Sequence, residues 1–100
     1  MNKYGLQNKF HAIEDKKEAL IAILIKASKI VLALPQCHLY MLSTEKENPN
    51  CIWVTEVWDS QDDHDKALMD PHVLNLIKEA LPLLSAMPEK GSVLTIIDGE

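Results

Sequence analysis

The segments CHLYMLSTE at residues 37–45 and CIWVTEVW at residues 51–58 decide the fold of this chain. Both are rich in β-branched, aromatic and sulfur-containing side chains, a composition typical of β-strands. The residues between them, Glu47-Asn48-Pro49-Asn50, have the chemistry of a turn. We therefore predict a β-hairpin in which Cys51 lies opposite a residue close to Thr44.

A further strand is predicted upstream, at residues 4–13 (YGLQNKFHAI). Side chains there alternate between two faces with a period of two, which is typical of a strand. Asn8 is flanked at two-residue spacing by Leu6 and Phe10. We expect these three residues on the face that packs against helices.

A long helix is predicted to follow this strand. Residues 14–18 include acidic side chains, which the first turn of a helix favours, and residues 19–34 are apolar almost all round. Pro35 prevents continuation, because proline has no backbone N–H and clashes with the preceding turn. A helix of this composition should be covered on more than one side.

Two shorter helices are predicted after the hairpin. Ser60, with Asp63 three residues later, forms a capping-box-like start for a helix that reaches about Met69. Asp70-Pro71 should cap the next helix, because proline is favoured in the first helical turn.

The end of the chain completes the topology. We expect the last helix to kink or end at Pro82, with Pro88 and Gly91 in a loop before a strand at residues 92–97. The order β-α-β-β-α-β predicts a ferredoxin-like α+β fold, a four-stranded antiparallel sheet with its helices on one face. We expect residues 1–100 to form a single domain.

The high apolar content of the chain suggests that it forms an oligomer. The chain has 100 residues, of which 47% are hydrophobic, and so short a chain buries a limited share of its surface alone. The predicted architecture also leaves one face of the sheet bare. Covering that face with a second copy is the simplest solution, so we expect a homodimer joined through the sheet.

Charge and cysteine content exclude several classes. Fifteen acidic residues exceed ten basic ones, all of them lysines, which argues against nucleic acid as a partner. No apolar run could span a bilayer, and the start of the chain lacks a signal-peptide pattern, so we expect a cytoplasmic protein without membrane association. Cys37 and Cys51 should lie about 23 Å apart along the hairpin, too far for a disulfide.

Residues 56–60 (EVWDS) and 67–72 (ALMDPH) resemble motifs of the antibiotic biosynthesis monooxygenase family, which includes quinol monooxygenases. The resemblance extends over nearly the whole chain, including the strand with Asn8, the long first helix and Cys37 at the start of the second strand. It implies a dimeric α+β barrel, in which each active site is a cavity between the sheet and the helices of one subunit.

The resemblance also implies cofactor-independent oxidation of a small electron-rich aromatic, a hydroquinone or phenol, by molecular oxygen. The glycine content agrees, because Gly5, Gly91 and Gly99 cannot form a flavin, nicotinamide or phosphate-binding motif. We therefore expect an oxidoreductase, a monooxygenase, that uses no cofactor.

One position departs from the family pattern. Members often have a histidine where this chain has Ala67, and the nearest histidine is His64, three residues earlier on the predicted helix. Haem-degrading relatives have a tryptophan at the Ala67 position and an axial histidine near Ile77. Both are missing, so haem degradation is disfavoured.

Three side chains are the candidate catalytic residues. His72 or His64 would take the proton of the phenolic hydroxyl, and Asn8 would donate a hydrogen bond to the developing oxyanion. Each also has a purely structural explanation, because a buried amide can satisfy backbone groups and histidines at helix starts are often solvated.

Aromatic and histidine side chains of the hairpin are candidates for binding the substrate. Trp53 and Trp58 are an odd number of residues apart, so one faces the helices and the other faces away. The hairpin register leaves open which is which. Tyr40 and His38 share a face of the neighbouring strand and could extend the lining of the cavity.

Two acidic features have structural explanations. Glu56 should be paired or partly exposed, with Lys66 and Lys9 as possible partners. The run at residues 62–65 (DDHD) could suggest a metal site, but neighbouring helix positions point in different directions, and we expect none.

Two other functions remain open from the sequence. The same barrel supports an isomerase of a small metabolite, although the chain has no arginine to bind a phosphorylated one. A non-catalytic dimer that binds small molecules is the second alternative.

Overall fold

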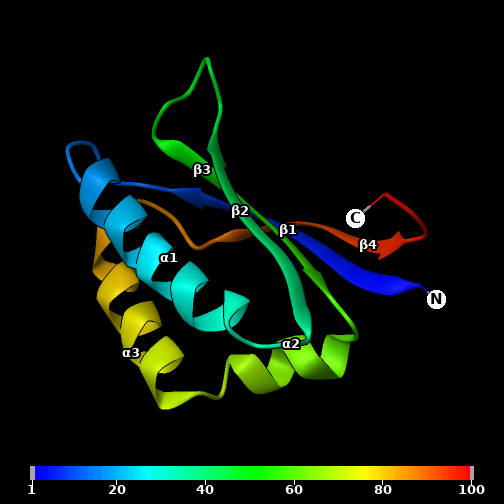
Figure 1. The fold of residues 1–100 in the computed structure, drawn as a ribbon. Coiled ribbons are helices and arrows are strands. Elements are labelled where there is room, and N and C mark those ends of the chain that lie inside the picture. The colour runs from blue at the N-terminus through cyan, green and yellow to red at the C-terminus, as the bar shows by residue number, and fades with distance from the viewer. Residues whose placement is uncertain (1, 100) are drawn as a thin grey trace.

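The computed structural model describes residues 2–99 of the chain (Figure 1). Its elements, in chain order, are β1 (Lys3–His11), α1 (Lys17–Leu32), β2 (Cys37–Thr44), β3 (Cys51–Trp58), α2 (Gln61–Ala67), α3 (Pro71–Ala80), the 3₁₀ turn η1 (Leu81–Leu83) and β4 (Glu89–Ile96). The strands form one antiparallel sheet in the order β2-β3-β1-β4. Because β1 lies between β3 and β4, this is the ferredoxin-like α+β topology predicted from the element order.

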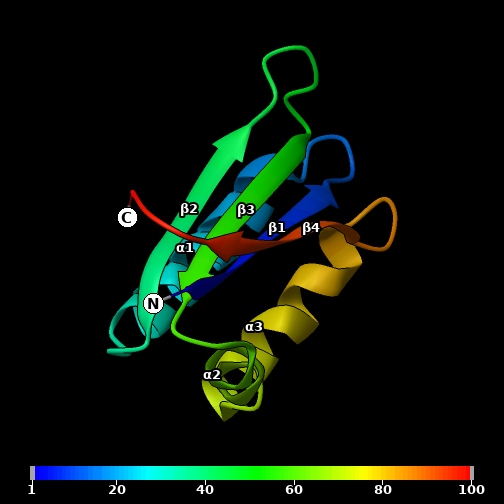
Figure 2. The same cartoon turned by 90° about the vertical axis from the view of Figure 1, so that its right-hand side faces the viewer.

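The helices lie on one face of this sheet. Helices α1 and α3 pack against each other there, and α2 lies beyond the end of β3 (Figure 1). Figure 2 looks onto the opposite face, which no helix among residues 2–99 covers. Apolar side chains on that face, Leu39, Met41 and Leu94, are exposed. No helix among the described residues has the length and apolar composition needed to cross a membrane.

The predicted hairpin is confirmed. Thr44 pairs with Ile52, and the Glu45 N–H donates to the Cys51 carbonyl oxygen at 3.3 Å, so the predicted register is correct to within one residue. Cys37 pairs with Trp58 at the other end of the hairpin, and both cysteines are free thiols.

The predicted starts of α2 and α3 are confirmed as well. The Ser60 hydroxyl accepts the Asp63 N–H at 3.2 Å, which caps α2. The Asp70 carboxylate accepts the N–H groups of His72 and Val73, with proline at the first position of α3. These caps satisfy backbone donors that have no partner within a helix.

Helix α1 is shorter than the sequence predicts, covering Lys17–Leu32 rather than residues 14–34. Asp15 has a φ of 72°, which a right-handed helix does not allow. The Lys16 N–H instead closes a turn by donating to the Ile13 carbonyl oxygen at 2.9 Å. Glu14 and Asp15 therefore belong to a turn, whereas Glu18 lies in the first turn of α1 as predicted.

Strand β4 begins earlier than predicted, at Glu89 rather than at Ser92. Gly91 therefore lies within the strand, next to a register shift between Gln7 and Asn8 of β1. A Cβ at Gly91 would lie 2.7 Å from the Gln7 carbonyl oxygen. Glycine serves here to allow two backbones to approach closely rather than to make a loop.

Two apolar clusters form the core between the sheet and the helices. One contains Ala12, Leu20, Leu24, Ile52, Val54 and Ala80. The other contains Val31, Cys37, Trp58, Ala67 and Val73. Both clusters combine residues of α1, α3 and the sheet.

Candidate functional site

A cavity of about 280 Å³ lies between the two core clusters, under α1, α2 and α3. Its walls include residues of both clusters, among them Leu24 and Val31 of α1. Ile77 and Leu81, which are partly exposed, border it on the side of α3 and η1. The cavity is therefore largely apolar, and Ile77 and Leu81 lie at its solvent-exposed side.

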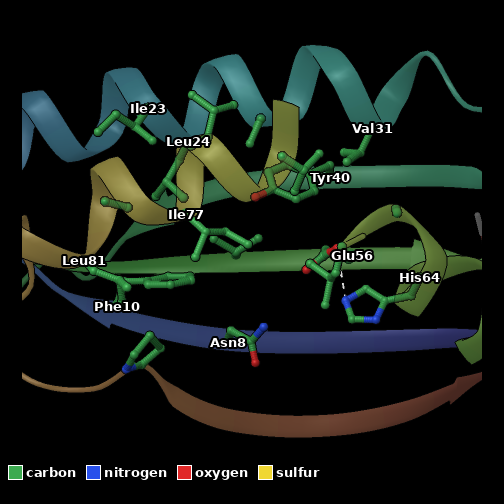
Figure 3. A pocket seen from close by; sticks show the side chains of 18 of the residues that line it. Asn8, Phe10, Ile23, Leu24, Val31, Tyr40, Glu56, His64, Ile77 and Leu81 are labelled. Atoms are coloured by element: carbon green, nitrogen blue, oxygen red, sulfur yellow. Dashed lines mark ion pairs between the residues drawn. The ribbon is translucent and has the colours of Figure 1, made fainter. Parts of the chain in front are cut away.

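The two titratable side chains Glu56 and His64 lie at one end of this cavity. Figure 3 shows Glu56 and His64 close together there, and Phe10 and Leu81 toward the other end. Asn8 points into the space between them (Figure 3). The side chains with polar atoms that line the cavity are Asn8, Tyr40, Glu56, Trp58 and His64.

Glu56 is a buried carboxyl at the centre of this polar end, with 7% of its surface exposed. The Trp58 Nε1–H donates to its Oε1 at 3.0 Å, and His64 Nε2 lies 3.9 Å from the same oxygen. Burial raises the pKa of Glu56, while the hydrogen bond from Trp58 and the charge of His64 act in the opposite direction. The carboxyl thus has a stronger affinity for protons than one in water.

His64 holds a fixed position on α2 and is 8% exposed. Its ring lies 5.7 Å, centroid to centroid, from the rings of both Tyr4 and Trp58. Nδ1 lies 3.0 Å from Asp65 Oδ1, so the two ring nitrogens face different carboxyl groups. Ring packing and these two contacts together limit rotation of the imidazole.

Asn8 and Tyr40 reach the cavity from β1 and β2. Asn8 pairs with Val54 of β3 next to the β1–β4 register shift, and its amide is a neutral donor and acceptor. Burial, followed by the charge of Glu56, raises the pKa of Tyr40, so its hydroxyl stays protonated and can donate.

Together these groups form an acid–base pair beside neutral donors in an apolar cavity. Such an arrangement can take a proton from an uncharged ligand and stabilise the anion that results. Within residues 2–99, no three His, Cys, Asp or Glu side chains are arranged to hold a metal ion.

Comparison with protein families matches residues 4–79 to the family described as antibiotic biosynthesis monooxygenase. The chain belongs to this family. The match covers both strands of the hairpin, Asn8, Glu56 and His64, and it confirms the resemblance seen in the motifs at residues 56–60 and 67–72. The family acts on small substrates with oxygen. A search of curated proteins found no match.

Solved structures of similar proteins agree with this assignment. One from Chloroflexus aurantiacus, provisionally assigned as an antibiotic biosynthesis monooxygenase, is 31% identical, with a TM-score of 0.79 over 98% of this chain and 94% of that one. SnoaB from Streptomyces nogalater, described as a cofactor-independent oxygenase, is 18% identical, with a TM-score of 0.82 over 97% and 95%. A Nitrosomonas europaea protein is 12% identical, with a TM-score of 0.87 over 92% and 88%. The last two establish the fold alone.

Four of the seven predicted site residues line the cavity of this family member. They are Asn8, Tyr40, Trp58 and His64. Ala67, where relatives often have a histidine, also lines the cavity, on the same helix as His64. Trp58 faces the helices and Trp53 faces away, as the odd spacing predicted.

The structure places His72 elsewhere. Its side chain is exposed and borders a shallow hollow between α1 and α3, beside Lys26 and Glu79. The Asp70 cap and Pro71 set the start of α3, and position 72 then points away from the sheet. His72 and His64 therefore do not meet in one cavity.

His38 and Trp53 also lie outside the cavity. A register shift between Cys37 and Leu39 makes His38 a bulge residue, so it does not share the face of Tyr40 as predicted. His38 Nε2 instead lies 2.6 Å from Asp59 Oδ1. On the bare face, the Trp53 ring lies under Lys9 Nζ, and the Trp53 Nε1–H donates to Glu45 Oε1 at 3.0 Å.

The prediction for Glu56 is wrong in its partners, because His64 and Trp58 contact it rather than Lys66 or Lys9. Lys9 Nζ lies 4.7 Å from the centre of the Trp53 ring and 3.5 Å from Glu45 Oε1. The contact between Glu56 and Trp58 could have been predicted from the sequence. The two residues are two positions apart on one strand, so their side chains lie on the same face. The apolar lining carried no signal, because aliphatic residues that line a cavity and those that fill a core have the same pattern.

Proposed function

We propose that this chain is a cofactor-independent monooxygenase that oxidises a small, uncharged, electron-rich phenol or hydroquinone with molecular oxygen. The observation that carries the proposal is the buried Glu56–His64 pair at the polar end of an otherwise apolar cavity. Membership of the antibiotic biosynthesis monooxygenase family supports the reaction class.

The reaction begins with removal of a proton. The substrate hydroxyl gives its proton to the Glu56–His64 pair, and Asn8 donates a hydrogen bond to the phenolate oxygen. The electron-rich phenolate then transfers one electron to oxygen, and recombination of the two radicals forms a carbon–oxygen bond. Cleavage of the O–O bond yields the quinone-type carbonyl and one water, which accounts for both oxygen atoms and all electrons.

The lining of the cavity favours a neutral, flat ligand. None of the lysines that the structure describes lines it, so a carboxylate or phosphate group on the substrate would have no lysine to pair with. The carboxyl of Glu56 would repel such an anion. Trp58, Tyr40 and Phe10 supply aromatic surface against which a ring can pack.

The proposal includes a homodimer formed through the bare sheet face and residues 1–100 acting as one domain. Leu39, Met41 and Leu94 are exposed on that face, where a second copy would remove them from water. The cavity opens on the helical side, so dimerisation would leave access to it free.

Oxygen consumption tests the function directly. With menadiol or an anthrone as substrate, we expect the wild type to consume oxygen, and His64→Ala and Asn8→Ala to lose at least about 99% of the rate while remaining folded. His72→Ala is the matched control, because its histidine lies outside the cavity, and it should retain the wild-type rate. Equal rates in all four proteins would refute the site.

Binding without oxygen consumption is the competing outcome. Quinones that raise the melting temperature of the wild type but not of a cavity-blocking Ala67→Trp variant would identify a small-molecule-binding dimer instead. Ala67 is a suitable position because it lines the cavity and is buried.

A further inference from the structure

Three titratable side chains lead from the cavity to the protein surface. Their side-chain exposures rise along the series, from 8% for Glu56 to 10% for His64 and 58% for Asp65. His64 is in the middle, with Nε2 facing Glu56 and Nδ1 facing Asp65. A histidine with different carboxyl groups at its two nitrogens can take a proton on one side and release one on the other.

The contact with Asp65 determines which nitrogen holds the proton in the neutral ring. Asp65 is solvent-exposed and accepts hydrogen bonds, so the 3.0 Å contact requires a proton on Nδ1. Nε2 then presents its lone pair toward Glu56. Trp58 and His64 both contact Oε1 of Glu56, so Oε2 is the oxygen that can meet a ligand.

We propose that Asp65 is the outer end of a proton path, Glu56 to His64 to Asp65 to water, that connects the polar end of the cavity with solvent. This inference rests on the proposed function, since a substrate that fills the cavity blocks the direct route for the proton. Asp65 does not contact the substrate in this scheme. It acts through His64, as a positioning and relay residue.

Each transfer moves one proton and changes only O–H and N–H bonds. Glu56 takes the substrate proton and passes it to Nε2, and Nδ1 releases its own proton to Asp65. The 3.9 Å separation between Glu56 and His64 exceeds a hydrogen bond, so Glu56 must rotate toward the ring for its step. The path runs in reverse when the peroxide is protonated to release water, so no proton accumulates.

Among residues 2–99, the rings of Tyr4 and Trp58 also contact the His64 ring. Tyr4 of β1 faces the ring, and burial, followed by the charges of Asp65 and Glu56, raises its pKa. Its hydroxyl therefore stays protonated. Trp58 of β3 can only donate.

The Asp65→Asn variant tests this path in the oxygen-consumption assay. Asparagine can accept the Nδ1–H but cannot take up its proton, so we expect turnover in dilute buffer to fall about tenfold or more. Added imidazole, a small diffusible base, should restore it. Asp62→Asn is the matched control on the same helix, and it should show neither effect. Equal rates for the two variants at every buffer concentration would overturn the proposal.

Nuclear magnetic resonance separates this inference from the proposed function. In ¹⁵N-labelled protein, the neutral His64 ring should hold its proton on Nδ1 in the wild type and in Asp62→Asn. A neutral ring protonated on Nε2 in the wild type would overturn the path even if the enzyme is active. If no substrate is consumed but Nδ1 holds the proton, the proposed reaction fails, while the arrangement of Glu56, His64 and Asp65 stands.

Discussion

Replacing Glu56 by glutamine should stabilise the protein at neutral pH and reduce its activity. Glutamine has nearly the same shape, and its amide oxygen can accept the Trp58 Nε1–H that Glu56 accepts at 3.0 Å. It has no charge to desolvate and cannot take up a proton. We therefore expect a loss of about a hundredfold or more in turnover from a variant that unfolds less easily than the wild type.

The size of the stability gain follows from the pKa of Glu56. Burial raises this pKa in the folded protein above its ordinary value of 4.5. Above pH 4.5 the folded state retains a proton that the unfolded state has released, so the free energy of unfolding decreases as the pH rises. The slope for one proton is at most about 1.4 kcal/mol per pH unit, and it ends once the pH passes the raised pKa.

Urea unfolding of the wild type and Glu56→Gln between pH 4 and pH 8 measures this effect. The difference in the free energy of unfolding should be small below pH 4.5 and should grow in favour of the variant above it. A difference that stays constant or shrinks as the pH rises would refute the assignment of Glu56 as a desolvated carboxyl.

Glu45→Gln is the matched control for this experiment. Glu45 also accepts a tryptophan N–H, from Trp53 at 3.0 Å, but it lies on the bare face of the sheet. That hydrogen bond, together with Cys51 and Lys9, lowers the pKa of Glu45. Its charged form therefore supports the fold above pH 4.5 and loses that contribution as the pH falls, so the pH dependence of Glu45→Gln should have the opposite sign.

Four further outcomes are expected. Met41→Glu on the bare face should convert a dimer into a species of 11.3 kDa in sedimentation equilibrium. Gly91→Ala should lower the free energy of unfolding by about 1–3 kcal/mol in urea, because its Cβ would lie 2.7 Å from the Gln7 carbonyl oxygen. Asp70→Ala removes the cap of α3 and should cost about 1 kcal/mol in the same assay. Cys37, whose pKa burial raises to about 11, should resist iodoacetamide at pH 8 until the protein unfolds.

Local patterns in the sequence predicted most of the secondary structure. Capping side chains at Ser60 and Asp70 set the starts of α2 and α3, and both act within three residues of their own position. Strand alternation placed Asn8 on the helical face and sent Trp53 and Trp58 to opposite faces. Helix caps and strand alternation can be predicted from the sequence because they depend on residues that are close together in the chain.

Two of the errors, at Gly91 and His38, came from positions where a backbone contact between distant segments decides the outcome. The sequence around Gly91 is typical of a loop, but Gly91 packs against the backbone of Gln7 in β1. The bulge at His38 depends on how β2 pairs with the end of β3. Neither contact has a local pattern, because the partner residues are far away in the chain.

The sequence by itself determined the order of the elements, the hairpin, the helix caps and the family of this protein. Only the tertiary structure decided that Glu56 of β3 and His64 of α2 form a pair, and that His72 lies outside the cavity. The reason is physical: a capped helix can start without specifying which way each side chain points relative to a sheet. The direction of the His64 side chain depends on its packing against Tyr4 of β1 and Trp58 of β3.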